Sequence, residues 1–119
     1  MEIIKDTIKE NTVVALGNFD GLHRAHTEII NRTCAYAKKH GLLSCVLLFK
    51  THTNVVTASK DTKLLTDERE KLHILRDLGV DLVYIQDFDS DFMHISPKEF
   101  IVFLKNKLNA CAVSVGYDY

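Results

Sequence analysis

Residues 13–26 read Val-Val-Ala-Leu-Gly-Asn-Phe-Asp-Gly-Leu-His-Arg-Ala-His. The stretch begins as a short, partly β-branched run and continues into a helical pattern, so it predicts a strand-to-helix turn. Gly17 and Gly21 keep this turn free of Cβ atoms, which lets a ligand approach the backbone. His23 and His26 fall where the helix begins, and there unpaired backbone N–H groups and the helix dipole favour an anion. The stretch therefore predicts a turn that handles phosphate without the lysine of a P-loop.

Four apolar runs predict the strands of the domain. They are near-continuous rather than alternating, which is typical of a parallel sheet with both faces covered. The runs are Val13–Leu16, Leu43–Phe49, Leu82–Ile85 and Cys111–Val115.

Three helical patterns lie between these runs. The first extends from about Arg24 to Lys39, and the second from Thr66 or Asp67 to Gly79. The third opens with Ser96-Pro97-Lys98-Glu99, which supplies an N-cap, a proline at the first helical position and a capping-box glutamate. Apolar residues at helical spacing mark the inner faces: Ile30, Cys34 and Ala37, then Leu72, Leu75 and Leu78, then Phe100, Leu104 and Leu108.

The alternating order of strands and helices predicts an α/β fold, with a Rossmann-like, doubly wound parallel sheet in three α/β/α layers. Ligands of such sheets bind beyond the carboxyl ends of the strands, where the turn at 17–26 lies. The polar, threonine-rich connection from Lys50 to Leu65 starts at the same edge and is long enough to suggest a function. The chain stops at Gly116–Tyr119, directly after a strand and without a following helix, which predicts a truncated domain.

Composition limits the classes of function. The 119 residues suit a single domain, and 15 basic against 16 acidic residues leave a net charge of −1, which argues against a general nucleic-acid binder. No apolar run has membrane-spanning length, and the first residues lack the features of a signal peptide. Cys34, Cys45 and Cys111 are scattered in apolar runs, so we expect buried free thiols and a cytoplasmic protein.

The motif at 16–26 resembles the N-terminal signature of FAD synthetases. These are the FMN adenylyltransferase modules of bifunctional riboflavin kinase/FAD synthetases, in the nucleotidyltransferase superfamily that carries a His-x-Gly-His motif. Gly-Asn-Phe-Asp-Gly followed by Leu-His is closer to this flavin branch than to the Gly-Thr-Phe-Asp of cytidylyltransferases. Further residues that resemble the family are Leu64-Leu65-Thr66 with Glu70-Lys71-Leu72, then Leu78–Asp81, then Phe88-Asp89, Phe92, Ser96-Pro97 and Phe100, and finally Val115–Tyr119.

The resemblance implies a reaction and its ligands. ATP and FMN would give FAD and pyrophosphate, with Mg²⁺, and residues 1–119 would be the N-terminal portion of the adenylyltransferase domain without the riboflavin kinase domain. It also implies small-molecule substrates, with neither nucleic acid nor a membrane as partner. An exposed edge of the shortened sheet would allow pairing with a second copy of the chain.

The resemblance also assigns roles to individual residues. His23 and His26 would contact the ATP phosphates as the catalytic pair, and no protein metal ligand is expected. The nucleotide-binding set would be Gly17, Asn18, Phe19, Asp20, Gly21, Ala25 and Asp118, and the flavin-binding pair Phe19 and His52. Two positions depart from the family pattern: Ala25 replaces a usual glycine, and Phe49–Thr53 lacks the two prolines of Phe-x-Pro-His-Pro.

Other interpretations of the same residues stay open. His23 and His26 could be solvated side chains at a helix start, or could form a metal site with Asp20. The helical spacing of Phe88, Phe92, Phe100 and Phe103 favours core packing over a flavin platform. For the whole chain, the alternatives are a non-catalytic fragment that binds nucleotide or flavin, and a cytidylyltransferase-like enzyme with another substrate.

Overall fold

Five parallel strands form a single sheet in the computed structural model, which describes residues 1–16, 24–50 and 69–115. The strand order across the sheet is β1-β4-β3-β2-β5, and each neighbouring pair is parallel. The strands are β1 (Glu2–Ile4), β2 (Thr12–Leu16), β3 (Leu43–Lys50), β4 (Leu82–Asp87) and β5 (Ala110–Val115).

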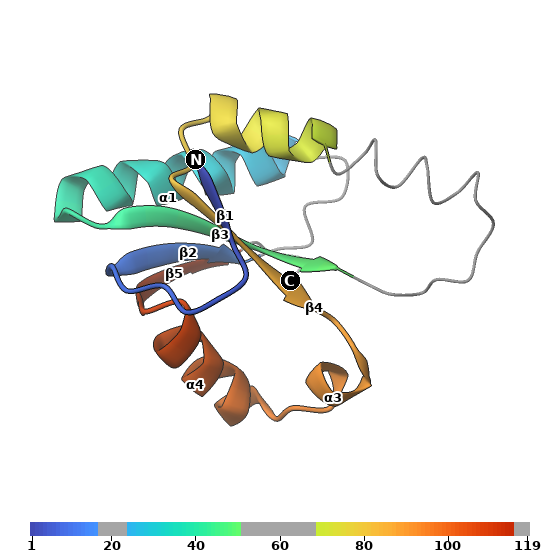
Figure 1. Cartoon of the computed structure of the whole chain (residues 1–119). Helices are drawn as coiled ribbons and strands as arrows, with labels where there is room; N and C mark the ends of the chain where they lie inside the picture. Colours follow the sequence, from blue (N-terminus) through green and yellow to red (C-terminus); the bar gives the residue numbers. More distant parts are fainter. Residues whose placement is uncertain (17–23, 51–68, 116–119) are drawn as a thin grey trace, which may run out of the picture.

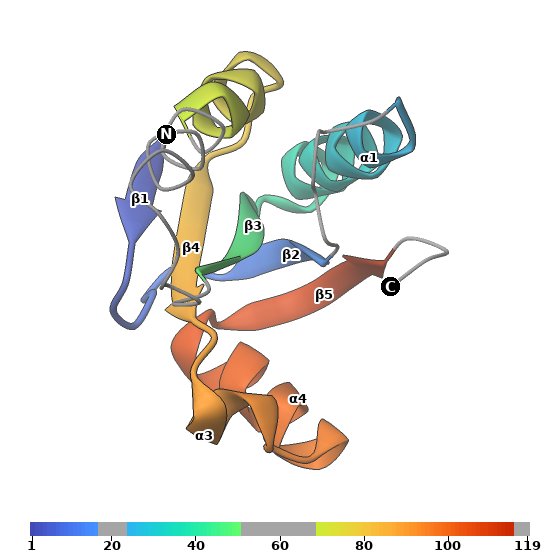
Figure 2. The ribbon, with the colours of Figure 1, turned by 90° about the vertical axis from the view of Figure 1, so that its right-hand side faces the viewer.

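Helices cover both faces of this sheet (Figures 1 and 2). Helix α1 (Arg24–His40) and a helical segment over residues 69–77 lie on one face. The short helix α3 (Ser90–Met93) and α4 (Pro97–Lys107) lie on the other. The three-layer, doubly wound α/β fold predicted from the sequence is therefore confirmed. None of the helices in these described ranges is long and apolar enough to cross a membrane.

Alternate residues of the central strands enter two separate cores. Val14, Cys45 and Leu47 belong to the core on the α4 side, whereas Ala15 and Val46 belong to the core on the α1 side. Burial on both faces explains why these strands are apolar without alternation. The prediction was wrong for β5, whose residues alternate between half-buried and exposed because it lies at the edge of the sheet.

The predicted helix ends are largely confirmed. The Ser96 side chain accepts a hydrogen bond from the Glu99 backbone N–H at 3.1 Å, and the Glu99 carboxylate accepts one from the Ser96 N–H, also at 3.1 Å. This reciprocal pair is the capping box that the sequence indicated. Gly41 and Gly79 follow two of the helices with φ of +68° and +95°, a left-handed conformation that favours glycine. The predicted start of the second helix, at Thr66 or Asp67, lies outside the described residues.

A polar clamp joins β3 and β4 at their amino ends. The backbone N–H and the hydroxyl of Ser44 both donate to Oδ2 of Asp81, at 3.0 and 3.1 Å. The Asp81 N–H donates back to the Ser44 hydroxyl oxygen at 2.9 Å. Because the Ser44 side chain is buried, this network satisfies polar groups that would otherwise be costly. The clamp lies at the amino ends of the strands, whereas the predicted ligand site lies at their carboxyl ends.

The three cysteines are free thiols, as predicted, but only one of them is fully buried. Cys45 is buried in β3, Cys34 is half-buried in α1, and Cys111 is exposed. The expectation of burial was wrong for Cys111, which lies on the edge strand β5, where the register with β2 shifts between Ala110 and Ala112.

We expect Cys111 to react with iodoacetamide well before the other two thiols in the folded chain. Burial raises the pKa of Cys34, and it raises the pKa of Cys45 to about 12, which leaves roughly 10⁻⁴ of that thiol ionised at pH 8. Pulse labelling followed by peptide mapping measures the order. The fully unfolded chain is the control, since all three thiols should then react alike. Labelling of Cys45 ahead of Cys111 in the native chain would contradict the burial described for Cys45.

Candidate functional site

The carboxyl edge of the sheet contains the point where the strand order reverses. The chain passes from β2 to β3 and then β4 on one side, and it returns to place β5 on the other side of β2. Leu16, the last residue of β2, is in register with Val115, the last residue of β5. These two neighbouring strands therefore end at the same level. A reversal of this kind is where doubly wound sheets bind ligands.

The amino end of α1 belongs to the same edge. Because α1 connects the parallel strands β2 and β3, it starts at the carboxyl end of β2, and it packs against β2, β3 and β5. Its first residue is Arg24, and its first turn carries no acidic residue. The amino end of α1, with the positive end of the helix dipole, thus lies at the strand-order reversal, which is a suitable environment for a phosphate.

The structure brings together the chain segments that flank the predicted site residues. His26 and Ala25 belong to the first turn of α1, where the backbone alone is described. The other predicted site residues lie outside the described residues: Gly17, Asn18, Phe19, Asp20, Gly21, His23, His52 and Asp118. In the sequence, each of them either follows closely on the end of a described strand or precedes α1. Their roles stay predictions.

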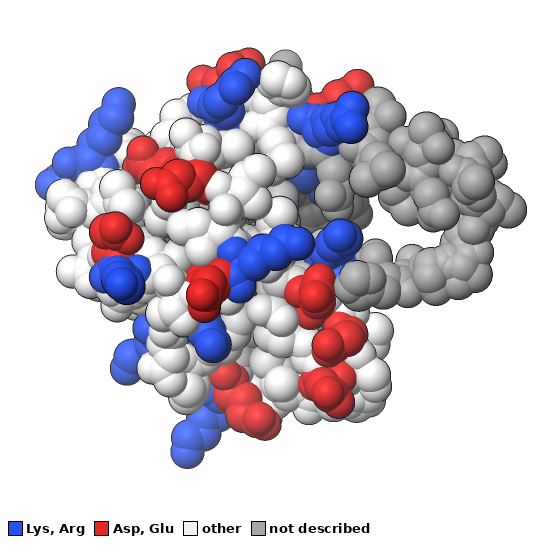
Figure 3. All heavy atoms as spheres, in the orientation of Figure 1, with Lys and Arg blue, Asp and Glu red and all other residues white. Residues whose placement is uncertain are grey.

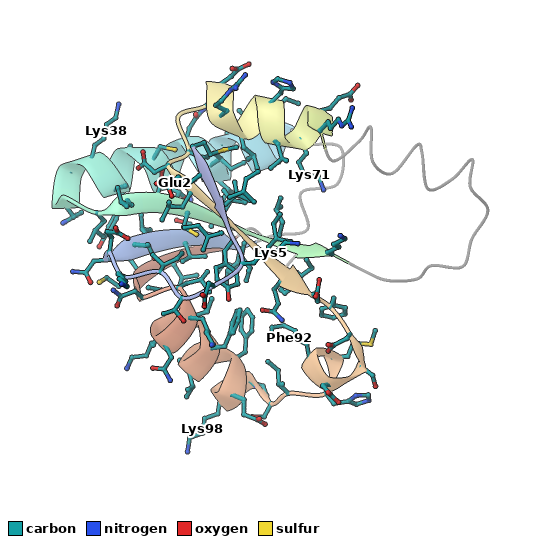
Figure 4. The ribbon with its side chains drawn as sticks, viewed as in Figure 1. Glu2, Lys5, Lys38, Lys71, Phe92 and Lys98 are labelled. Carbon is teal, nitrogen blue, oxygen red and sulfur yellow. The ribbon has the colours of Figure 1, made fainter. Side chains whose placement is uncertain are left out.

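An aromatic cluster borders the carboxyl ends of β3 and β4 (Figure 4). Phe92 of α3 lies at its centre, with ring centroids 5.6 Å from Phe49, 6.0 Å from Phe88 and 5.1 Å from Phe103. Phe100 and Phe103 pack against the α4-side core, in agreement with the core interpretation. Each ring is only half-buried, however, so part of the cluster faces outward. Sequence reasoning did not include Phe49 in this cluster, because its ring contacts with Phe88 and Phe92 depend on the tertiary fold at the end of β3.

Charge is evenly mixed over the surface that Figure 3 shows. Lysines and arginines alternate with aspartates and glutamates, and no broad basic stripe is seen on this face. This agrees with the expectation from the net charge. Within the described ranges, no three His, Cys, Asp or Glu side chains gather to hold a metal ion, and Asp20, His23 and His26 lie outside that search.

The family of this chain follows from comparison with known proteins. A family model described as FAD synthetase matches residues 5–119. The chain belongs to the FAD synthetase family. The matched residues include the motif at 17–26, the ends of β2 and β5 at the strand-order reversal, and the aromatic cluster. The resemblance drawn from the motif is therefore confirmed over nearly the whole chain.

Curated members of the FAD synthetase family match at moderate identity. The chain is 36% identical to a bifunctional riboflavin kinase/FMN adenylyltransferase of Listeria monocytogenes, and the match covers 92% of the chain and 35% of that protein. A protein of the same description from Escherichia coli is 34% identical, with 93% and 36% covered. The chain thus spans about a third of the length of these relatives.

Two solved structures support the fold. A crystal structure described as a macrolide-efflux protein from Streptococcus pneumoniae matches with a TM-score of 0.74 and 26% identity, over 98% of this chain and 41% of that one. A universal stress protein from Archaeoglobus fulgidus matches with a TM-score of 0.55 over 91% of this chain and 76% of its own length. At 14% identity, the second shows a shared fold alone.

Proposed function

We propose that a protein carrying this domain transfers the adenylyl group of ATP to FMN, which forms FAD and pyrophosphate. The observation that carries the proposal is the register of Leu16 with Val115, under the amino end of α1. This register supports a site in which the motif at 17–26 and the residues after β5 act on one ligand. Family membership supports the choice of ATP and FMN.

The proposed step is a direct displacement at phosphorus. An oxygen of the FMN phosphate attacks the α-phosphorus of ATP, the bond to the bridging oxygen breaks, and pyrophosphate leaves with that electron pair. No covalent enzyme intermediate is needed, so catalysis consists of positioning and charge neutralisation. His23 and His26 would donate hydrogen bonds to the phosphate oxygens beside the α1 amino end. Mg²⁺ would neutralise further phosphate charge.

The remaining residues of the proposed site bind rather than react. Nucleotide would contact the backbone and side chains of Gly17, Asn18, Phe19, Asp20, Gly21, Ala25 and Asp118. Flavin would contact Phe19 and His52. Phe49 supports the flavin placement, since its half-buried ring stands three residues before His52 at the end of β3.

The extent and setting of the protein are also proposals. Residues 1–119 would be the N-terminal portion of the adenylyltransferase domain, without a riboflavin kinase domain, which agrees with coverage of 35% of the Listeria relative. Three free thiols support a reducing, cytoplasmic setting. We also propose that copies of the chain associate through an edge of the sheet.

Calorimetric titration with ATP, FMN and CTP tests the site on the 119-residue chain. We expect weak binding of ATP and FMN, weaker binding of CTP, and negligible FAD synthesis when ATP and FMN are mixed with the chain. His26→Ala should weaken ATP binding, whereas His40→Ala, at the other end of α1, should leave it unchanged. Absence of ATP binding would contradict the site, preference for CTP would favour a cytidylyltransferase-like enzyme, and rapid FAD synthesis would contradict the truncation.

A further inference from the structure

An amide side chain interrupts an otherwise apolar row on the α4-side face of the sheet. Along β4, Leu82 and Tyr84 enter the α4-side core, and Gln86 has the same parity, so its side chain emerges on that face. Phe49 of β3 is the register partner of Gln86 and packs against the same core. Gln86 is therefore a polar residue on the core-facing side of an inner strand, close to the carboxyl edge.

Aromatic rings gather around the end of this row. The rings of Phe49 and Phe88 lie 5.2 Å apart, edge to face. The ring of Phe92, which belongs to α3, lies 5.6 Å from the first and 6.0 Å from the second (Figure 4). Gln86 is beside Phe49 in the sheet and two residues before Phe88 in the chain. Since all three rings are half-buried, the amide lies at the border of a partly accessible aromatic surface.

The hydrogen-bonding groups of Gln86 are only partly used. Its Nε2 donates one hydrogen bond to the backbone oxygen of Asp87, at 3.1 Å. The second N–H of Nε2 and the Oε1 atom make no hydrogen bond with the described residues. A glutamine amide thus keeps a donor and an acceptor side by side. This arrangement is complementary to a flat ring whose edge carries an acceptor next to a donor.

We propose that Gln86 recognises the imide edge of the isoalloxazine ring of FMN, an inference that rests on the proposed function. The flavin N3–H would donate a hydrogen bond to Oε1, and the free N–H of Nε2 would donate one to an adjacent flavin carbonyl. The flat ring would lie against the half-buried aromatic rings. Gln86 selects the ring in this way and takes no part in the displacement at phosphorus.

The position of Gln86 in the sheet favours flavin over adenine. Adenine also carries a donor beside an acceptor, and glutamine can pair with it. The proposed nucleotide residues follow β2 and β5 or belong to the start of α1, however, and β3 separates β4 from β2. The proposed flavin residue His52 comes three residues after Phe49, the register partner of Gln86. The amide is therefore on the flavin side of the site.

Titration of FMN with the 119-residue chain, followed by quenching of flavin fluorescence, tests the proposal. We expect Gln86→Ala to raise the Kd for FMN roughly 3- to 10-fold, the effect of losing one neutral hydrogen bond, and to leave the Kd for ATP unchanged. Asn106→Ala is the matched control and should change neither constant. Asn106 is an exposed amide near the end of α4, which leads to the amino end of β2. Circular dichroism verifies that both variants fold.

A flavin analogue tests the same contact without changing the protein. In 3-methyl-FMN a methyl group replaces the hydrogen on N3, so the donor to Oε1 is lost. We expect this analogue to bind the unchanged chain more weakly than FMN does. Gln86→Ala should bind the analogue and FMN alike, because the contact is already absent and the shorter side chain leaves room for the methyl group.

The outcomes separate this inference from the proposed function. An equal Kd for FMN with and without Gln86→Ala, or an effect of the methyl group that persists in Gln86→Ala, would overturn the inference and leave the proposed function standing. Weaker binding of ATP in place of FMN would overturn it in favour of adenine recognition. Failure of the unchanged chain to bind FMN would contradict the proposed function, and the inference with it.

Discussion

Replacing His26 with alanine is expected to lower the rate of FAD formation 10²- to 10³-fold, about 3–4 kcal/mol in activation free energy, which is the cost of one transition-state hydrogen-bond donor. His26 belongs to the first turn of α1, which begins at the strand-order reversal. A suitable protein for the measurement joins residues 1–119 to the remaining part of the Listeria monocytogenes relative. Steady-state kinetics with ATP and FMN then separate kcat from KM.

The matched control for this experiment is His40→Ala. His40 is the last residue of α1 and is exposed, so the variant changes the same residue type in the same helix, away from the proposed site. We expect its kcat to equal that of the unchanged fusion. A normal kcat for His26→Ala, with the fusion folded and active, would remove the histidine from the proposed mechanism.

Leu47→Ala is expected to destabilise the chain by about 2–5 kcal/mol, the range for truncating a fully buried leucine. Leu47 lies in the central strand β3, is 1% exposed and belongs to the α4-side core. The cost combines lost apolar burial with the cavity that remains. Urea unfolding followed by circular dichroism measures the difference in free energy.

Ile74→Ala provides the comparison for that measurement. Ile74 lies in the helical segment over residues 69–77 and is exposed, so its truncation should change the free energy of unfolding by less than about 0.5 kcal/mol. Equal effects of the two substitutions would mean that Leu47 is not buried as described. Self-association shifts apparent stability, so both variants are compared at one protein concentration.

The sequence was sufficient to predict the main strands, the helices and the class of fold. Long elements repeat their apolar residues often enough to reveal a period, as with Ile30 and Ala37 of α1, which are both buried. The capping box at Ser96 marked a helix start to the residue, because its hydrogen bonds form within four consecutive residues. Local chemistry of this kind can be inferred without knowing the tertiary fold.

Sequence reasoning missed the elements that exist through tertiary contact. Strand β1 has three residues and forms by pairing with β4, so no periodicity indicates it. Helix α3 has four residues, and its one local signal is Asp89, whose side chain accepts a hydrogen bond from the Phe92 N–H at 2.9 Å. The exposure of Cys111 was also missed, because β5 looks like its buried neighbours until the strand order is known.

The candidate site likewise has one part that the sequence indicated and another part that depends on the tertiary fold. The motif at 17–26 indicated both the chemistry and the family, since its glycines and histidines act over a short span of chain. The neighbouring segment at the end of β5 could be found only from the strand order, which places Val115 beside Leu16. The contribution of Phe49 to the aromatic cluster likewise depends on contacts with α3.

The register between Leu16 and Val115 has a consequence for folding. Nearly the whole chain separates these two residues, so their contact is among the most non-local in the molecule. Contacts of this kind close a large loop and tend to form slowly. During synthesis, β2, α1 and β3 can pair before β5 has left the ribosome, but the strand-order reversal does not yet exist. The ligand site should therefore not form before β5 docks, and ATP should bind no folding intermediate that lacks this strand pairing.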